Sequence, residues 1–238
     1  MPDEATIALW QTLFVVAGRT LEHGHVEHLD RFLELLLRAN ERMNLTRIRD
    51  RSSAEIEHVA DALTLLRHFP RGRCRLADIG AGGGVPGMVL AIARPDCSVT
   101  LIESIRKKAD FLRATANELR LVNTTVMCDR AETIGRSELR ESFDVVTARA
   151  VAGLPTLLQW SMPLLRAGGR LLAMKGPKVA DELPACRSLL RPLGAAEPCL
   201  HPVDVESLPG RCVVEVVKIA STDSRYPVSP TRARRKHR

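Results

Sequence analysis

The chain has 238 residues, enough to bury one substantial core or one core with an appendage. Its formal net charge is +7, but six basic residues and no acidic residue lie after residue 224, so the preceding residues are nearly neutral. No apolar run approaches the roughly 18 residues that cross a bilayer, and the acidic start Met1–Glu4 lacks the profile of a secretory signal. We therefore expect a cytoplasmic protein without a membrane partner.

The first 72 residues are predicted to form a helical N-terminal region that packs on the core. Apolar residues recur at helical spacing from Val26 to Leu37, which predicts an amphipathic helix near 26–39. A second helix is expected to begin at Ser52, because Ser52 and Glu55 have the spacing of a capping box. Pro70-Arg71-Gly72 is then expected to close this region.

Strands and helices alternate in the following segment, 73–222. Such alternation predicts an α/β fold with a mostly parallel sheet covered by helices on both faces. The last two strands have no clear helix between them, so we expect an antiparallel hairpin that closes the sheet. The seven predicted strands are 75–80, 98–103, 124–128, 143–148, 170–175, 196–205 and 211–220. Residues 223–238 are predicted to be a disordered basic tail, for which contact with nucleic acid and a purely solubilising role remain open.

Cysteines and histidines are informative through their spacing. The six cysteines are widely scattered without a C-x-x-C pair, which favours small buried thiols over a disulfide framework or a zinc site. The segment His23-Gly-His25-x-x-His28 has no carboxylate motif beside it, so we expect no metal site. The cysteines are Cys74, Cys97, Cys128, Cys186, Cys199 and Cys212.

The first predicted strand runs directly into a glycine-rich loop. Five glycines occur in the eight positions from Gly80 to Gly87, and such a loop can turn sharply while a ligand approaches its backbone. Pro86 suits the first turn of a following helix. In an open α/β sheet, ligands bind at the carboxyl ends of the strands, near such a turn. We therefore expect a nucleotide-like ligand here.

The acidic residues around this loop distinguish between two ligands. Glu103 ends the next strand, 23 residues after Gly80, where its carboxylate can accept hydrogen bonds from ribose hydroxyls. A dinucleotide fingerprint that begins at Gly80 fails, because its third position is Val85. The segment Asp78–Gly82 instead supplies an acid and glycine at the strand end, followed by small residues. This arrangement, with the closing hairpin, favours S-adenosylmethionine.

The ends of the other strands indicate the methyl acceptor. The fourth strand is followed neither by the Pro-Pro-Tyr motif of exocyclic amine methylation nor by a cysteine nucleophile. Several basic residues instead follow the strands, which fits a phosphate-rich substrate. A ring nitrogen with its own lone pair needs no general base, so we assign no catalytic residue. The basic residues are Lys107, Lys108, Arg130, Arg149 and Lys175.

Together these motifs resemble the RsmG (GidB) family of bacterial small-subunit rRNA methyltransferases, over nearly the whole chain. The resemblance implies a class I S-adenosylmethionine-dependent methyltransferase fold, Rossmann-like, that methylates N7 of a guanine in a conserved loop of 16S rRNA. The matching elements are Asn44-Leu45-Thr46, His58-x-x-Asp61, Asp78–Gly87, Leu101–Glu103, Lys107-Lys108-x-x-Phe111-Leu112, Arg130-Ala-Glu132, Phe143–Val151 and Met174-Lys175-Gly176.

The resemblance also implies site residues. The expected cofactor residues are Gly80, Gly82, Val85, Glu103, Ala131, Glu132 and Arg149, and the expected RNA-binding residues are Lys107, Arg130, Arg149 and Lys175. Mild departures from the family pattern occur at Ala62, Ala81 and Val85, and Val228 replaces an expected arginine.

We expect the partner to be 16S rRNA or a small ribosomal subunit precursor, not DNA, and the protein to be a monomer. A non-catalytic RNA-binding ribosome-assembly factor on the same fold is the alternative. A small-molecule methyltransferase is disfavoured by the basic strand ends.

Overall fold

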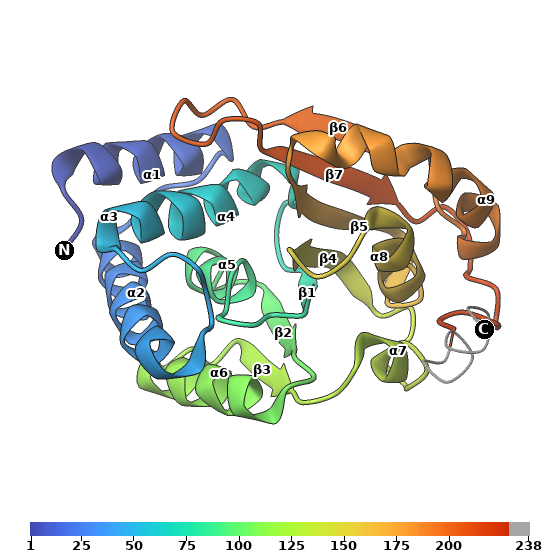
Figure 1. Ribbon diagram of the computed structural model, residues 1–238, viewed down its shortest axis with the longest axis horizontal. Helices are drawn as coiled ribbons and strands as arrows, with labels where there is room; N and C mark the ends of the chain where they lie inside the picture. The colour runs from blue at the N-terminus through green and yellow to red at the C-terminus, as the bar shows by residue number, and fades with distance from the viewer. Residues whose placement is uncertain (229–238) are drawn as a thin grey trace.

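A seven-stranded sheet with helices on both faces forms the centre of the protein (Figure 1). The computed structural model describes residues 1–228. The strand order is β3-β2-β1-β4-β5-β7-β6, with β1 to β5 parallel and β7 antiparallel to both of its neighbours. The predicted α/β class and closing hairpin are thereby confirmed. The strands are β1 (Arg75–Ile79), β2 (Ser98–Ile102), β3 (Thr124–Met127), β4 (Phe143–Arg149), β5 (Leu165–Lys175), β6 (Cys199–Pro202) and β7 (Cys212–Val217).

The helices cover the sheet in two layers, each with its own apolar cluster. One face packs against α1 (Glu4–Val16), α2 (His23–Met43), α3 (Arg51–Ala54), the π-helix η1 (Glu55–Ala60), α4 (Asp61–Leu63), the 3-10 helix η2 (Thr64–His68), α5 (Gly87–Ala93) and α6 (Arg106–Glu118). The other face packs against α7 (Ala131–Ile134), α8 (Leu154–Ser161), the 3-10 helix η3 (Pro177–Glu182) and α9 (Leu183–Leu193).

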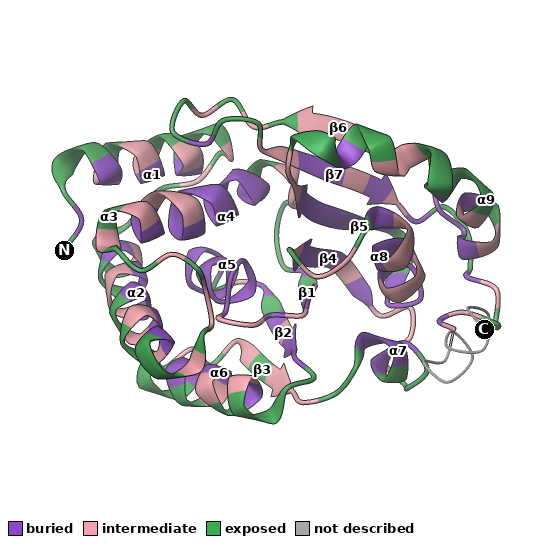
Figure 2. Ribbon diagram, in the orientation of Figure 1, coloured by how far each residue is buried: buried purple, intermediate pink, exposed green. Residues whose placement is uncertain are grey.

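Alternate residues of the central strands supply the two clusters. Leu76 on β1 lies in the first cluster and Ala77 in the second, and Leu101 and Ile102 on β2 divide in the same way. A parallel strand buried on both faces reads as a continuous apolar run, which is why Leu76 to Ile79 is detectable in the sequence. Figure 2 shows the buried strands between the two helical layers.

The N-terminal helices belong to the same apolar cluster as the sheet. Trp10 and Phe14 on α1 and Phe32 on α2 are fully or almost fully buried in it. The predicted helix near 26–39 is present and extends over His23–Met43. The predicted capping box at Ser52 is wrong: Asp50 caps the helix by accepting a hydrogen bond from the Ser53 N–H, and the Glu55 carboxylate accepts one from Arg51.

The expectation that all six cysteines are free thiols is wrong for one pair. Cys74 and Cys97 form a disulfide, with Cα atoms 4.7 Å apart. The two residues precede β1 and β2, whose parallel register sets Arg75 opposite Ser98 and so brings the cysteines together. Because they are 23 residues apart in the chain, sequence spacing alone did not reveal this contact. The other four cysteines are free.

The beginning of the predicted tail packs on the body of the protein, contrary to the expectation of disorder from residue 223. The Arg140 guanidinium donates a hydrogen bond to the carbonyl oxygen of Tyr226, and that of Arg136 donates one to the carbonyl oxygen of Pro227. The remainder of the predicted tail, residues 229–238, lies outside the described residues. None of the described helices is long and apolar enough to span a membrane.

Candidate active site

The glycine loop between β1 and α5 adopts conformations that side chains rarely allow. Gly80 has a φ of +66°, and a Cβ atom there would lie 2.7 Å from Cγ2 of Val151. The N–H of Gly80 donates to the Ile102 carbonyl at the end of β2. The loop is therefore held tightly against the ends of β2 and β4, with its glycine backbone at the carboxyl edge of the sheet.

Asp78 fixes both ends of this loop from inside the protein. Its fully buried carboxylate accepts hydrogen bonds from the Gly87 N–H at 3.0 Å and from the Thr147 hydroxyl at 2.8 Å. Burial raises the pKa of Asp78 to about 7, while these two hydrogen bonds oppose the rise. Asp78 thus joins β1, β4 and the start of α5, and its contacts are those of a structural residue.

Glu103, predicted as a ribose acceptor, lies beside the glycine loop. Its Oε2 atom accepts from the Gly82 N–H at 3.0 Å, and its Oε1 atom accepts from the Ile105 N–H at 2.7 Å. A carboxylate offers about four lone-pair sites, so two remain for a ligand. The two backbone bonds fix the orientation of the carboxylate before any ligand arrives.

Arg149 at the end of β4 joins three sequence motifs. Its guanidinium donates to Nδ1 of His58 at 2.9 Å and to the Glu57 carbonyl at 2.7 Å. Because arginine only donates, Nδ1 of His58 must accept. Nε2 then bears the proton and donates to the Thr46 hydroxyl at 2.9 Å. The residues singled out at positions 46, 58 and 149 therefore form one chain of hydrogen bonds.

The ionisable side chains in and beside this chain of hydrogen bonds are largely buried. Burial, with the neighbouring charge of Arg149, lowers the pKa of His58 to about 3, so the ring is neutral at neutral pH. Oδ2 of Asp61 makes no hydrogen bond and lies 3.6 Å from Nη1 of Arg149 and 3.9 Å from Nε of Arg211. Asp61 therefore forms ion pairs with both arginines.

A cavity of about 930 Å³ is lined by residues of the glycine loop and of the segment Asn44–Arg49. Four predicted site residues line it, namely Gly80, Gly82, Val85 and Arg149. Three further basic residues in its wall, Arg47, Arg49 and Arg211, were not expected from the sequence. A fourth, Lys108, was expected only as one of the basic residues that follow the strands. Arg47 and Arg49 directly follow the Asn44-Leu45-Thr46 motif, which could have indicated them. Arg211 lies in the loop before β7, where no sequence pattern marks it.

The other predicted residues do not line this cavity. Ala131 and Glu132 begin α7 after β3 and are buried. Lys107 on α6 and Arg130 before α7 are exposed. Lys175 ends β5, and its ammonium donates to the Ala152 carbonyl at 2.9 Å and pairs with Glu182 at 3.0 Å. All of these follow the carboxyl ends of parallel strands, so they lie on one edge of the sheet, but Lys175 is already engaged.

The histidines near the start of α2 each have a separate partner. His23 pairs with Glu27, and the His28 ring bonds to the Gly24 carbonyl. The His25 ring accepts from the Glu22 N–H and lies against Phe14. The three rings therefore do not converge on a common point.

The strand order, the glycine loop and the carboxylate at the end of β2 define the class I S-adenosylmethionine-dependent methyltransferase fold. A SAM-dependent O-methyltransferase from Thermotoga maritima superimposes with a TM-score of 0.50 at 17% identity, and the match covers 79% of this chain and 73% of that one. The methyltransferase SibL superimposes with a TM-score of 0.51 at 19% identity, and the match covers 63% of this chain and 51% of that one.

Sequence comparison identifies the family. The family model described as rRNA small subunit methyltransferase G matches residues 25–197. Ribosomal RNA small subunit methyltransferase G of Chloroflexus aggregans is 44% identical over 87% of both chains. Its namesake from Deinococcus radiodurans is 43% identical over 85% of this chain and 81% of its own. The chain belongs to the rRNA small subunit methyltransferase G (GidB) family, which confirms the resemblance stated from the motifs.

Proposed function

We propose that the protein transfers a methyl group from S-adenosylmethionine to N7 of a guanine in a conserved loop of 16S rRNA. One observation supports this proposal most strongly: the cavity that the glycine loop lines is also lined by Arg47, Arg49 and Arg211. A cofactor site and a phosphate-binding wall then face the same space, as transfer of a methyl group to RNA requires. The family membership of the chain supports the same reaction.

The cofactor is proposed to lie along the carboxyl edge of the sheet. Gly80, Gly82 and Val85 would contact the methionine part, and the two free lone-pair sites of Glu103 would accept from the ribose. Ala131 and Glu132, at the start of α7, would complete the site. The rRNA phosphates would contact Arg149, Lys107, Arg130 and Lys175, together with the arginines of the cavity wall.

Methyl transfer to N7 depends on positioning more than on proton transfer. N7 has its own lone pair, so no base must remove a proton. The arrangement of His58 is consistent with this, because both of its ring nitrogens are occupied by Arg149 and Thr46. His58 would therefore hold Arg149 in place and would not act as a general base.

Transfer of a labelled methyl group tests the proposal. Purified protein is incubated with labelled S-adenosylmethionine and either naked 16S rRNA or small ribosomal subunits, and the RNA is digested to nucleosides. Label in 7-methylguanosine is expected. Label only on an exocyclic amine or a carbon would refute the N7 assignment, and turnover on small molecules without RNA would refute the rRNA substrate.

A non-catalytic assembly factor on the same fold would behave differently. Thermal unfolding with and without S-adenosylmethionine distinguishes it, because a ligand that binds only the folded state raises the unfolding temperature. We expect such a rise for this protein. We also propose that the protein acts in the cytoplasm as a monomer, with 16S rRNA or a precursor of the small subunit as its partner.

A further inference from the structure

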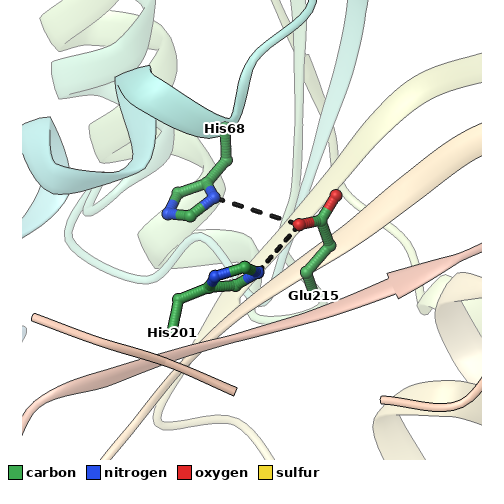
Figure 3. A group of neighbouring side chains, drawn as sticks. All are labelled: His68, His201 and Glu215. Atoms are coloured by element: carbon green, nitrogen blue, oxygen red, sulfur yellow. Dashed lines mark hydrogen bonds and ion pairs between the residues drawn. The ribbon is translucent and has the colours of Figure 1, made fainter. Parts of the chain in front are cut away.

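Two histidines and a glutamate meet where the N-terminal helices contact the closing hairpin. His68 ends η2, His201 lies on β6, and Glu215 lies on β7 (Figure 3). In the β6–β7 register Cys199 is opposite Glu215, so His201 is the diagonal neighbour of Glu215 on the same face of the sheet. That face is the one covered by the N-terminal helices, which is why His68 can reach it.

The three side chains direct possible ligand atoms toward a common point. Nε2 of His201 lies 2.9 Å from Oε2 of Glu215, and Nδ1 of His68 lies 4.0 Å from the same oxygen. One ligand atom from each residue fits within 4.8 Å of the others. Two imidazole nitrogens and a carboxylate oxygen are a known ligand set of zinc. In a tetrahedral site with metal–ligand distances of about 2.1 Å, the ligand atoms lie about 3.4 Å from one another. Only small movements would complete this geometry.

We propose that His68, His201 and Glu215 bind a divalent transition-metal ion such as Zn²⁺, in a site separate from the methyl-transfer cavity. None of the three residues lines the cavity at the glycine loop. The ion would link the end of the N-terminal helices to the β6–β7 hairpin. The proposal does not depend on the rRNA methyltransferase activity, and it departs from the absence of metal expected from the sequence.

The surroundings of the cluster suit such an ion. Nη1 of Arg170 donates to Oε1 of Glu215 at 2.7 Å, which orients the carboxylate and leaves Oε2 for the metal. The positive charges of Arg170 and of Arg67, which lines the adjoining cavity, oppose a cation, and the acidic residues Asp204 and Glu206 of that cavity favour one.

That adjoining cavity leaves room for a further ligand. It has a volume of about 420 Å³, and His68 and His201 lie in its wall. Asp204 and Glu206, in the loop after β6, line it as well. A water molecule in this cavity can occupy the fourth position of a tetrahedral site, since three protein ligands and one water are an established coordination of zinc.

Metal titration of the full chain tests the proposal. Protein without an affinity tag is stripped with EDTA, dialysed, and titrated with ZnCl₂ by calorimetry and with CoCl₂ by visible absorption. We expect one equivalent of Zn²⁺ to bind and Co²⁺ to give the visible bands of a low-symmetry nitrogen–oxygen site. His68→Gln and His201→Gln should each weaken Zn²⁺ binding at least tenfold.

Two matched variants serve as controls. His23→Gln removes an exposed histidine that pairs with Glu27, and Cys199→Ser removes the exposed thiol opposite Glu215; both should bind Zn²⁺ within twofold of the wild type. Thermal unfolding of each metal-free variant checks that it folds. His201→Gln should disturb the fold less than His68→Gln, because 34% of the His201 side chain is exposed, against 10% of the His68 side chain. The proposal is overturned if the wild type binds neither metal, if both histidine variants bind unchanged, or if binding depends on Cys199 alone.

Discussion

Arg149 and Asp61 form the most buried ion pair of the candidate site. Only 3% of the Asp61 side chain and 20% of the Arg149 side chain are exposed. Removing one member of a buried pair leaves a charge without its partner, which costs more than the pair itself contributes. The pair therefore has to be tested by changing both residues.

We expect Arg149→Ala to lower the free energy of unfolding by about 2 kcal/mol, less than the usual cost because Arg211 still faces Asp61. Arg149→Ala combined with Asp61→Asn should recover at least half of this loss, since the buried charge that has lost its nearer partner is gone. Urea unfolding of the two single variants and the double variant measures both values. Strictly additive losses would show that the two residues are not coupled.

His58 should make stability depend on pH. Its pKa is about 3 in the folded protein, against an ordinary value near 6.5. The unfolded chain therefore binds more protons between these values, so the stabilisation is complete above pH 6.5 and is lost as the pH falls. At pH 5 the loss from this group is about 2 kcal/mol.

His58→Gln is the variant that isolates this effect. Between pH 7 and pH 5 its free energy of unfolding should fall by about 2 kcal/mol less than that of the wild type. Other titrating groups, such as Asp78 and His68, are present in both proteins and cancel in the difference. Equal pH dependence of the two proteins would show that His58 is protonated in the folded state as readily as in the unfolded chain.

Among the junctions between elements, the start of α5 is a tightly packed one. A Cβ atom at Gly87 would lie 2.3 Å from Cδ2 of Leu101 and 2.6 Å from Oδ2 of Asp78. We expect Gly87→Ala to cost about 2–3 kcal/mol, because both neighbours are buried and cannot move freely. Gly24→Ala in α2 is the control, because a Cβ atom there would meet nothing within 4 Å. The higher helix propensity of alanine should raise the free energy of unfolding of this variant by about a few tenths of a kcal/mol.

Denaturant midpoints measure this pair of variants. Equal effects of the two substitutions would contradict the close packing at Gly87. Binding of S-adenosylmethionine, followed by calorimetry, should weaken in Gly87→Ala, since the loop is anchored to Asp78 through the Gly87 N–H.

Elements were predicted well where a local pattern determines them. The buried run of β1, the β-branched run of β7 and the period of α2 are visible in the sequence because burial imposes them. The cap at Asp50 was missed because Ser52 and Glu55 have the right spacing, but Glu55 is occupied by Arg51. The π-helix Glu55–Ala60 has no signal in the sequence pattern, since it depends on how this segment packs against the neighbouring helices.

The candidate site was predictable in its loop and less so in its walls. The glycine loop and Glu103 are neighbours of predictable strand ends, so topology alone places them together. The hydrogen bond from Arg149 to His58 joins residues far apart in the sequence, and Arg211 reaches Asp61 from a loop. Such contacts depend on how the N-terminal helices pack on the sheet, which periodicity does not encode.

At the scale of the whole molecule, the Cys74–Cys97 disulfide links the starts of two neighbouring strands. Closing a loop of this length restricts the unfolded chain and contributes about 3 kcal/mol. We expect alkylation of the unfolded, unreduced protein to modify four of the six cysteines, as counted by mass spectrometry. Cys74→Ser should lower the midpoint of urea unfolding, and added reductant should then have no further effect; six modified cysteines in the wild type would contradict the disulfide.

The shared apolar cluster between the N-terminal helices and the sheet has a consequence for dividing the chain. The connection from Pro70 to Arg73 is partly or fully exposed, and a Cβ atom at Gly72 would meet nothing within 4 Å. A backbone break there is easily accommodated. Each fragment alone would leave one half of a buried surface open to water. Two fragments divided at Gly72 would thus need each other to fold, and they provide a split protein whose reassembly restores the cavity.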